Sequence, residues 1–74
     1  MPRKFSGAAC RAKRVAAGLR PEYVALQIHR THYAVSSYEL DRCVPSTTIL
    51  AAMADLYGCA IDDFFTKEIA DVAG

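Results

Sequence analysis

Two histidines, two adjacent serines and an aspartate near the middle of the chain carry the functional groups of a hydrolase. They are His29, His32, Ser36, Ser37 and Asp41. A serine nucleophile needs a neighbouring base, a group that orients this base, and a pocket that excludes water. A chain of 74 residues holds one small domain with one core and has no room for such a pocket. We therefore expect no enzymatic activity and no small-molecule substrate.

The cysteines do not form a recognisable metal or disulfide pattern. Cys10, Cys43 and Cys59 are an odd number without a C-x-x-C pair, and a zinc site would have to borrow His29 and His32. Cys10 and Cys59 fall at positions that the apolar pattern assigns to the core, where free cysteine packs as a small hydrophobic residue. We expect no metal and no cofactor.

The composition is that of a folded domain. Hydrophobic residues make up 53% of the chain and charged residues 23%, which excludes a disordered chain. The longest apolar stretches are too short to span a bilayer, and the basic start is not followed by the apolar run of a secretory signal. We expect a cytoplasmic protein with no membrane partner.

Charge is distributed unevenly along the sequence, although the net charge is only +1. Residues 1–32 contain seven Lys and Arg against one acidic residue, a balance of +6. Residues 33–74 contain two Lys and Arg against seven acidic residues, a balance of −5. The asymmetry suggests that the amino-terminal half meets a polyanion, or that the helices carry unequal solvated faces.

Apolar spacing and helix-ending residues predict an all-α fold. Ser6, Thr31 and Ser46 are placed to cap helices, and Gly18 and Gly58 to end them. No run alternates apolar and polar residues between turns, so we expect no sheet. The five predicted helices run from Ser6 to Gly18, Pro21 to Ile28, His32 to Leu40, Ser46 to Gly58, and from Ile61 onward.

These helices predict a single domain over residues 1–74, a compact five-helix bundle. Residues 1–5 are expected to form a flexible basic arm, which either tracks a DNA groove or is a solvated terminus. Residues 66–74 form a tail whose apolar spacing would extend the fifth helix.

The junction between the second and third predicted helices is the informative feature. An eight-residue helix, a three-residue turn and a nine-residue helix cannot stack antiparallel, so the two helices must cross steeply. Close crossing needs a small residue, which Ala25 supplies, and Val35 and Tyr38 would pack over it. This is the geometry of a helix-turn-helix, in which the second helix lies in the major groove of DNA.

At this point the sequence resembles the Cro and lambda-repressor-like regulators, also called the xenobiotic-response-element family. The resemblance runs from about Phe5 to Phe65 and rests on the order and spacing of its pieces. The family fold is a compact bundle of five helices. The pieces are Arg14-Val-Ala-Ala-Gly-Leu19, Glu22-Tyr-Val-Ala25, Thr31, Ser36-Ser-Tyr-Glu39, Pro45-Ser46, Ala54-Asp-Leu-Tyr-Gly58 and Ile61-Asp-Asp-Phe-Phe65.

The chain departs from the family pattern around the turn. Arg20-Pro21 replaces the usual Ser or Thr followed by a Gln that touches the DNA backbone. His29 stands where the family has a glycine with positive φ, and Asp41 where a glycine often follows the third helix; both residue types tolerate that conformation. Arg30 replaces an apolar residue, and we expect its stem to lie over Ile28 while its guanidinium reaches outward.

The resemblance implies which residues read bases. The family positions correspond to His32, Tyr33 and Ser37, and Ser36 lies beside them. Histidine can donate to guanine, serine can donate or accept, and a tyrosine ring can contact a thymine methyl group or its hydroxyl a phosphate. The alternative is that His32 and Tyr33 are simply exposed residues at the start of a helix.

Phosphate contacts are expected from Arg20, Arg30 and Arg42, and from the start of the third helix at Thr31. The resemblance further implies that Arg14 and Glu39 form an ion pair between the first helix and the end of the third. Arg14 is then a structural residue.

The resemblance also implies a homodimer on two half-sites about one helical turn apart. Tyr57, Phe65, Ile69 and Val72 are the candidate apolar contacts of the dimer.

The predicted function is a sequence-specific regulator, a repressor that occupies operator DNA at the nucleoid. The alternative is a protein interaction module on the same fold, such as an antitoxin or a polymerase partner. The missing Gln at Pro21 and the low net charge favour this alternative.

Overall fold

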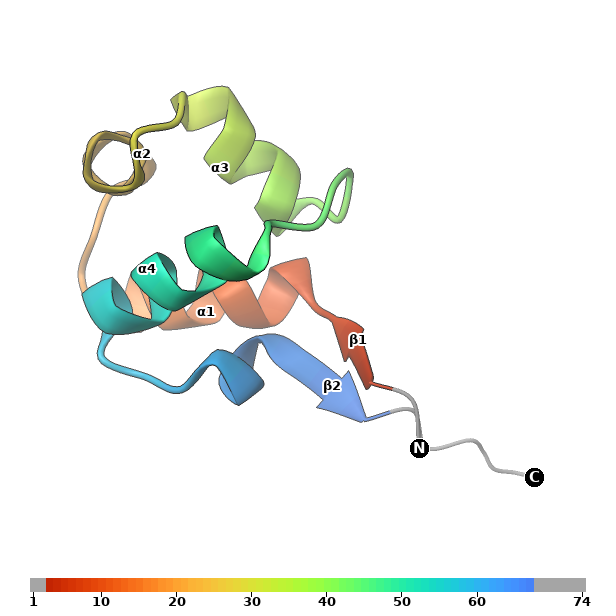
Figure 1. Ribbon diagram of the computed structural model, residues 1–74. Helices are drawn as coiled ribbons and strands as arrows, with labels where there is room; N and C mark the ends of the chain where they lie inside the picture. The colour runs from red at the N-terminus through yellow and green to blue at the C-terminus, as the bar shows by residue number, and fades with distance from the viewer. Residues whose placement is uncertain (1–2, 68–74) are drawn as a thin grey trace.

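Four α-helices, one 3₁₀ turn and two short strands make up residues 3–67, the part of the chain that the computed structural model describes (Figure 1). Their order places a strand at each end of the helical body. The elements are β1 (Arg3–Phe5), α1 (Gly7–Ala16), α2 (Pro21–Ile28), α3 (His32–Glu39), α4 (Thr47–Tyr57), the 3₁₀ turn η1 (Ile61–Phe64) and β2 (Phe65–Lys67).

Three hydroxyl side chains cap helices at the positions predicted. Each lies in extended backbone just before the first turn and accepts a hydrogen bond from an otherwise unpaired amide. The pairs, with their N–O distances, are Ala9 to Ser6 Oγ (3.1 Å), Ala34 to Thr31 Oγ1 (3.2 Å) and Ile49 to Ser46 Oγ (3.3 Å).

Within residues 3–67, two residues other than glycine adopt a left-handed conformation, as the resemblance implies. His29 has φ 58° and ends α2, while Asp41 has φ 62° and follows α3. His and Asp are among the residue types that accept this region at modest cost. The backbone can therefore turn sharply at both ends of α3 without glycine.

The core joins all four helices to η1. Helices α2 and α3 pack against each other, and Figure 1 shows α2 end-on while α3 runs in the plane of the view. Ala25, Val35 and Tyr38 are all buried in this core. The steep helix pair predicted from the three-residue turn is therefore confirmed.

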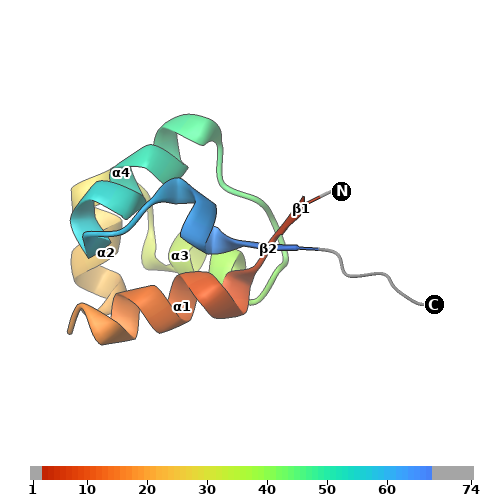
Figure 2. The same cartoon turned by 90° about the horizontal axis from the view of Figure 1, so that it is seen from below.

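The predicted fifth helix and the predicted absence of a sheet are wrong. The chain makes only a 3₁₀ turn at Ile61–Phe64 and then enters β2, which pairs antiparallel with β1 (Figure 2). Phe64 is fully buried, while Phe65 lies opposite Phe5 with ring centroids 6.0 Å apart in an edge-to-face contact. Phe65 to Lys67 are therefore extended residues that pair with Phe5 to Arg3, and not a turn of helix.

The sheet also changes the interpretation of the two chain ends. Residues 3–5 are a strand rather than part of a flexible arm, and Thr66 and Lys67 belong to β2 rather than to an extended helix. The rest of the predicted tail, residues 68–74, lies outside the described residues, as do residues 1 and 2. The amide of Ser6 donates to the carbonyl of Phe64 at 2.7 Å, so the strand pair is continuous with the helical body.

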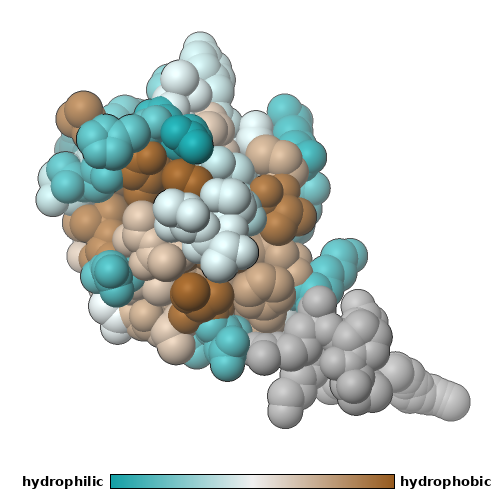
Figure 3. Space-filling model, in the orientation of Figure 1, coloured by the Kyte–Doolittle hydropathy of each residue, from teal (hydrophilic) through white to brown (hydrophobic). Residues whose placement is uncertain are grey.

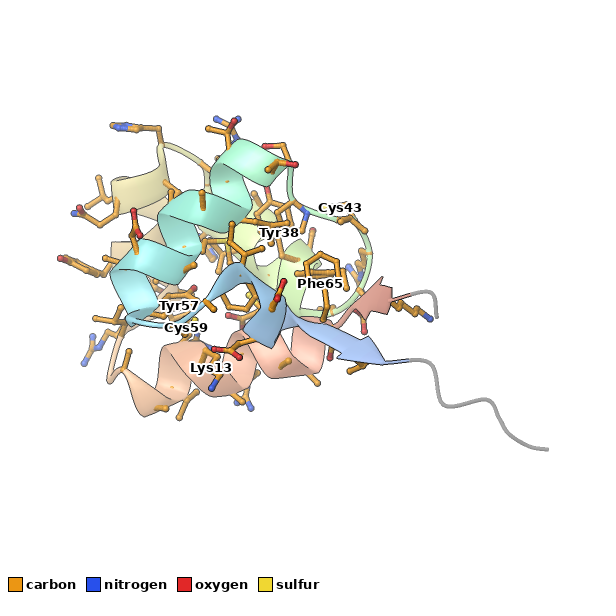
Figure 4. The ribbon with its side chains drawn as sticks, turned by 60° about the horizontal axis from the view of Figure 1, so that its bottom comes forward. Lys13, Tyr38, Cys43, Tyr57, Cys59 and Phe65 are labelled. Carbon is orange, nitrogen blue, oxygen red and sulfur yellow. The ribbon has the colours of Figure 1, made fainter. Side chains whose placement is uncertain are left out.

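Tyr57 brings a polar group into the core. Its hydroxyl is buried without a hydrogen-bond partner among the described residues, and its ring packs edge-on against Phe64. Figure 4 places Tyr57 and Cys59 between α4 and α1. Burial raises the pKa of Tyr57, and it raises the pKa of the Cys10 thiol from 9.0 to about 12. Both groups are therefore held in their neutral forms.

Replacing Tyr57 with Phe is expected to raise the free energy of unfolding by about 1 kcal/mol. The substitution removes a buried hydroxyl that has no partner and keeps the ring contact with Phe64. Urea denaturation of both proteins measures the change. Tyr23→Phe, at an exposed position of α2, is the matched control and should change stability by less than about 0.5 kcal/mol. A loss of stability in Tyr57→Phe would contradict the burial of an unpaired hydroxyl.

The contribution of the Cys10 thiol to stability should be constant at pH values well below 9 and should be lost as the pH rises toward 12. The unfolded chain loses the Cys10 proton near pH 9.0, whereas the folded protein keeps it to about pH 12, so unfolding is favoured between these values. Thermal unfolding in reducing buffer from about pH 7 to about pH 11 measures this dependence. Cys10→Ala should make the decline shallower, and Cys43→Ala, at an exposed position, should leave it unchanged. Equal slopes in all three proteins would refute the assignment.

Candidate nucleic-acid interface

Helix α3 presents the predicted base-reading residues on its outer side. Val35 and Tyr38 are buried on the inner side. His32 and Tyr33 are exposed in the first turn, and Ser36 and Ser37 are half-buried one turn later. The helix therefore offers its amino-terminal turn to the solvent, which is the end that enters the groove in a helix-turn-helix.

His32 and Tyr33 stack on each other. Their ring centroids are 4.5 Å apart with 27° between the planes. Sequence reasoning did not identify this contact, because neighbouring residues on a helix are directed about 100° apart and no spacing rule pairs them. Two adjacent aromatic rings at the start of a helix were the only available signal.

The predicted phosphate-binding side chains surround the ends of α2 and α3. Arg20 lies just before α2, and its exposed side chain makes no capping hydrogen bond, because a guanidinium has no acceptor atom. Arg42 is exposed in the loop after α3. The hydroxyl oxygen of Thr31 accepts from the amide of Ala34 and retains its proton for donation.

Arg30 differs from the expectation in detail. Its Nη1 donates to the carbonyl oxygen of His29 at 3.0 Å, so the guanidinium bends back over the turn instead of reaching freely outward. A guanidinium has five N–H donors, and this contact uses one of them. Arg30 can still contact an anion placed beside the turn.

Arg14 and Glu39 form a two-point ion pair between α1 and the end of α3. Arg14 Nε lies 2.7 Å from Glu39 Oε2, and Arg14 Nη2 donates to Oε1 at 3.1 Å. Nη1 donates to the carbonyl oxygen of Leu19 at 2.8 Å. The side chains are 10% and 8% exposed, and the hydrogen bond to Glu39 raises the pKa of Arg14. Removing one partner of such a buried pair costs about 3–5 kcal/mol.

Gly7 and Asp41 make a second tether at the same end of α3, which sequence reasoning missed. The Gly7 amide donates to Asp41 Oδ1 at 2.8 Å. A Cβ at Gly7 would lie 2.5 Å from the carbonyl oxygens of both Tyr38 and Glu39. The start of α1 therefore abuts the end of α3, and only glycine fits at the contact. The two residues are 34 positions apart, so no local pattern signals the contact.

The dimer candidates are placed differently from the expectation. Tyr57 is buried, so it is not available to a partner. Phe65 is half-buried and turned toward the body of the protein, where it packs on Phe5 (Figure 4). Ile69 and Val72 lie outside the described residues.

Within residues 3–67, the side chains form no candidate metal site. No group of three or more His, Cys, Asp and Glu side chains in this part of the chain could hold a metal ion. A shallow, open hollow lies beside the start of α2, away from the base-reading residues; its lining is Gly18, Leu19, Arg20, Glu22 and Tyr23. None of the described helices has the length and apolar character needed to cross a membrane.

Comparison with known proteins gives structural matches only. No protein-family model matches the sequence, and no curated protein matches it. The crystal structure of the P22 c2 repressor in complex with synthetic operator 9T, determined with Tl+, superposes with a TM-score of 0.73 at 22% identity, covering 80% of this chain and 89% of that one. The solution structure of the P22 c2 repressor DNA-binding domain (1–76) has a TM-score of 0.73 at 22% identity, covering 84% and 82%.

A third structure agrees with these two. The clp gene regulator ClgR from C. glutamicum has a TM-score of 0.71 at 26% identity, covering 78% of this chain and 75% of that one. The resemblance to the Cro and lambda-repressor-like proteins is thus confirmed in the fold. The fold is that of the P22 c2 repressor DNA-binding domain and of the regulator ClgR.

Gly7→Ala is expected to lower the free energy of unfolding by about 1–3 kcal/mol, because the new methyl group must displace the end of α3. This direction is opposite to the usual effect of alanine in a helix. Ala8→Gly, at the exposed next position of α1, is the matched control and should cost about 0.5–1 kcal/mol. Denaturant titration measures both. If Gly7→Ala stabilised the protein, the tight contact between α1 and α3 would be wrong.

Proposed function

We propose that this protein is a sequence-specific DNA-binding regulator that inserts the start of α3 into the major groove of an operator. One observation carries the proposal. The outer face of α3 is exposed at its amino-terminal turn, while its carboxy-terminal end is fixed to α1 by the buried pair of Arg14 and Glu39. A reading helix must be held within about 10–20° of its productive orientation, and a buried two-point ion pair does this.

His32, Tyr33, Ser36 and Ser37 are the proposed base contacts. Each is exposed or half-buried on α3, and none packs into the core. None of them offers the two-pronged hydrogen bond that Arg, Gln or Asn makes to a base. Each contact is therefore weak, and selectivity arises from their sum.

Arg20, Arg30, Thr31 and Arg42 are the proposed phosphate contacts. The three arginines are exposed around the two ends of α3 and the start of α2. Figure 3 shows hydrophilic side chains over the end of the molecule that α2 occupies. Contacts of this kind fix the position of the protein on the duplex and make its affinity depend on salt.

Repression by occupancy is the proposed mode of action. The structural match that carries DNA is a repressor bound to a synthetic operator. The hollow beside the start of α2 is open to solvent and does not enclose a small effector. A small domain that covers an operator excludes polymerase without a further activity.

We propose that two copies bind together, because one short helix with weak contacts gives low affinity. Leu40 and Val44 are exposed apolar side chains that follow directly on α3. They lie next to the proposed phosphate contact Arg42, so a second copy on an adjacent half-site is the partner that this position favours. They take the place of Tyr57 and Phe65 as candidate dimer contacts.

A protein interaction module is the second candidate function. It is favoured by Leu26, which is 73% exposed on α2, and by Pro21, which stands where a backbone-binding Gln is usual. Such a module would show no affinity for duplex DNA at low salt.

The test uses the full chain and a duplex selected from random-sequence DNA. Between about 50 and 200 mM salt, the plot of log affinity against log salt should have a slope near −3 for one copy, and about twice that for two copies. Arg42→Ala should weaken the selected and a random duplex alike and flatten the slope by about one unit. Ser37→Ala should cost about 1–3 kcal/mol on the selected duplex and little on the random one.

Arg11→Ala is the control, because it removes the same charge from the exposed side of α1. It should leave both affinity and slope unchanged. Absence of any binding at about 50 mM salt would refute the DNA-binding function and favour the interaction module. Equal losses of Ser37→Ala on every duplex would contradict base reading.

A further inference from the structure

The stacked rings of His32 and Tyr33 are an exposed feature that packing does not explain. Tyr33 is 74% exposed, the highest value among the large hydrophobic side chains of the described residues. Its ring lies against the imidazole of His32 and not in the core. Figure 3 shows a protrusion of intermediate hydropathy over the start of α3. An aromatic surface that remains in water at this position is available to a ligand.

Stacking prepares this surface for binding. A lone exposed tyrosine must give up rotamer freedom when it binds, whereas a ring already held by its neighbour loses less. The ring centroids of His32 and Tyr33 are 4.5 Å apart, and the ring planes are inclined by 27°, so the two rings are stacked. The pair therefore presents the largely apolar ring of Tyr33, with its hydroxyl at the edge and the polar imidazole of His32 beside it.

The major groove offers one apolar group to such a surface. The edges of the base pairs carry hydrogen-bond donors and acceptors, and only thymine adds a methyl group, at C5. The two serines on α3 supply single hydroxyl groups, so the ring pair is the only large apolar surface among the proposed base contacts. The best complement to the ring pair is therefore a thymine methyl group.

We propose that the His32–Tyr33 pair reads the C5-methyl group of thymine, so that the preferred operator contains a thymine under this pair in each half-site. The inference rests on the proposed function and names the chemical group that the site selects. Tyr33 makes the contact, and His32 positions its ring. The hydroxyl of Tyr33 is not required.

The experiment removes the methyl group and nothing else. Each thymine of the selected duplex is replaced in turn by uracil, and the affinity of the wild-type chain is measured at constant salt. Replacement at one or two positions per half-site should weaken binding about three- to fivefold each, the effect of exposing one buried methyl-sized group. Replacement elsewhere should have no effect.

Variants then assign the effect to the ring pair. Tyr33→Ala should bind the thymine and uracil duplexes equally, Tyr33→Phe should keep the full ratio, and His32→Ala should lower it. Leu26→Ala is the matched control, since it removes an equally exposed apolar side chain, 73% against 74%, from α2. It should keep the full ratio. Because Tyr33 packs outside the core, a thermal melt should show that its variants fold normally.

Three results would overturn the proposal. They are an affinity insensitive to uracil at every position, a uracil effect that persists in Tyr33→Ala, and a uracil effect that Leu26→Ala removes as well. These results differ from failure of the proposed function itself, which would appear as no duplex binding at low salt.

Discussion

The buried ion pair of Arg14 and Glu39 is the interaction on which the arrangement of α3 depends. A guanidinium and a carboxylate taken out of water are costly unless their hydrogen bonds are satisfied, and here two bonds join them while a third reaches the Leu19 carbonyl. Three separate segments, α1, the connection before α2 and the end of α3, are thereby fixed in one geometry. A hydrophobic contact would stabilise the same elements with less directional control.

The second tether acts at the same end of the helix. Gly7 approaches the last carbonyls of α3 and donates to Asp41, whose left-handed backbone turns the chain away immediately afterwards. The carboxy-terminal end of α3 is thus held by α1 at two points, while its first turn carries exposed rings and a hydroxyl cap. Rigidity at one end and exposure at the other is the distribution expected of a helix that is inserted into a groove.

Features that depend on residues close together in the sequence could be predicted, and features that depend on residues far apart could not. The caps at Ser6, Thr31 and Ser46 depend on a few neighbouring residues and were predicted correctly. The left-handed conformations of His29 and Asp41 were expected from the resemblance, because the family has glycine at both positions, and the structure shows them. The small sheet was missed because Phe65 pairs with Phe5 across almost the whole chain, and three-residue strands leave no alternation to detect. The contact of Gly7 and the stacking of His32 on Tyr33 depend on tertiary approach and on rotamers, which no spacing encodes.

The ion pair also changes how the charge asymmetry relates to DNA affinity. The charge balance of +6 in residues 1–32 includes Arg14, which is paired with Glu39. Fewer cationic side chains are therefore available to phosphates than the count suggests. The exposed arginines around α2 and α3 are Arg20 and Arg30 from this part of the chain, and Arg42 from the loop after α3. Few phosphate contacts imply weak non-specific binding, and weak non-specific binding leaves discrimination to the groove. An apolar contact between the His32–Tyr33 pair and a thymine methyl group suits such a protein, because its contribution to the binding affinity does not decline as the salt concentration rises.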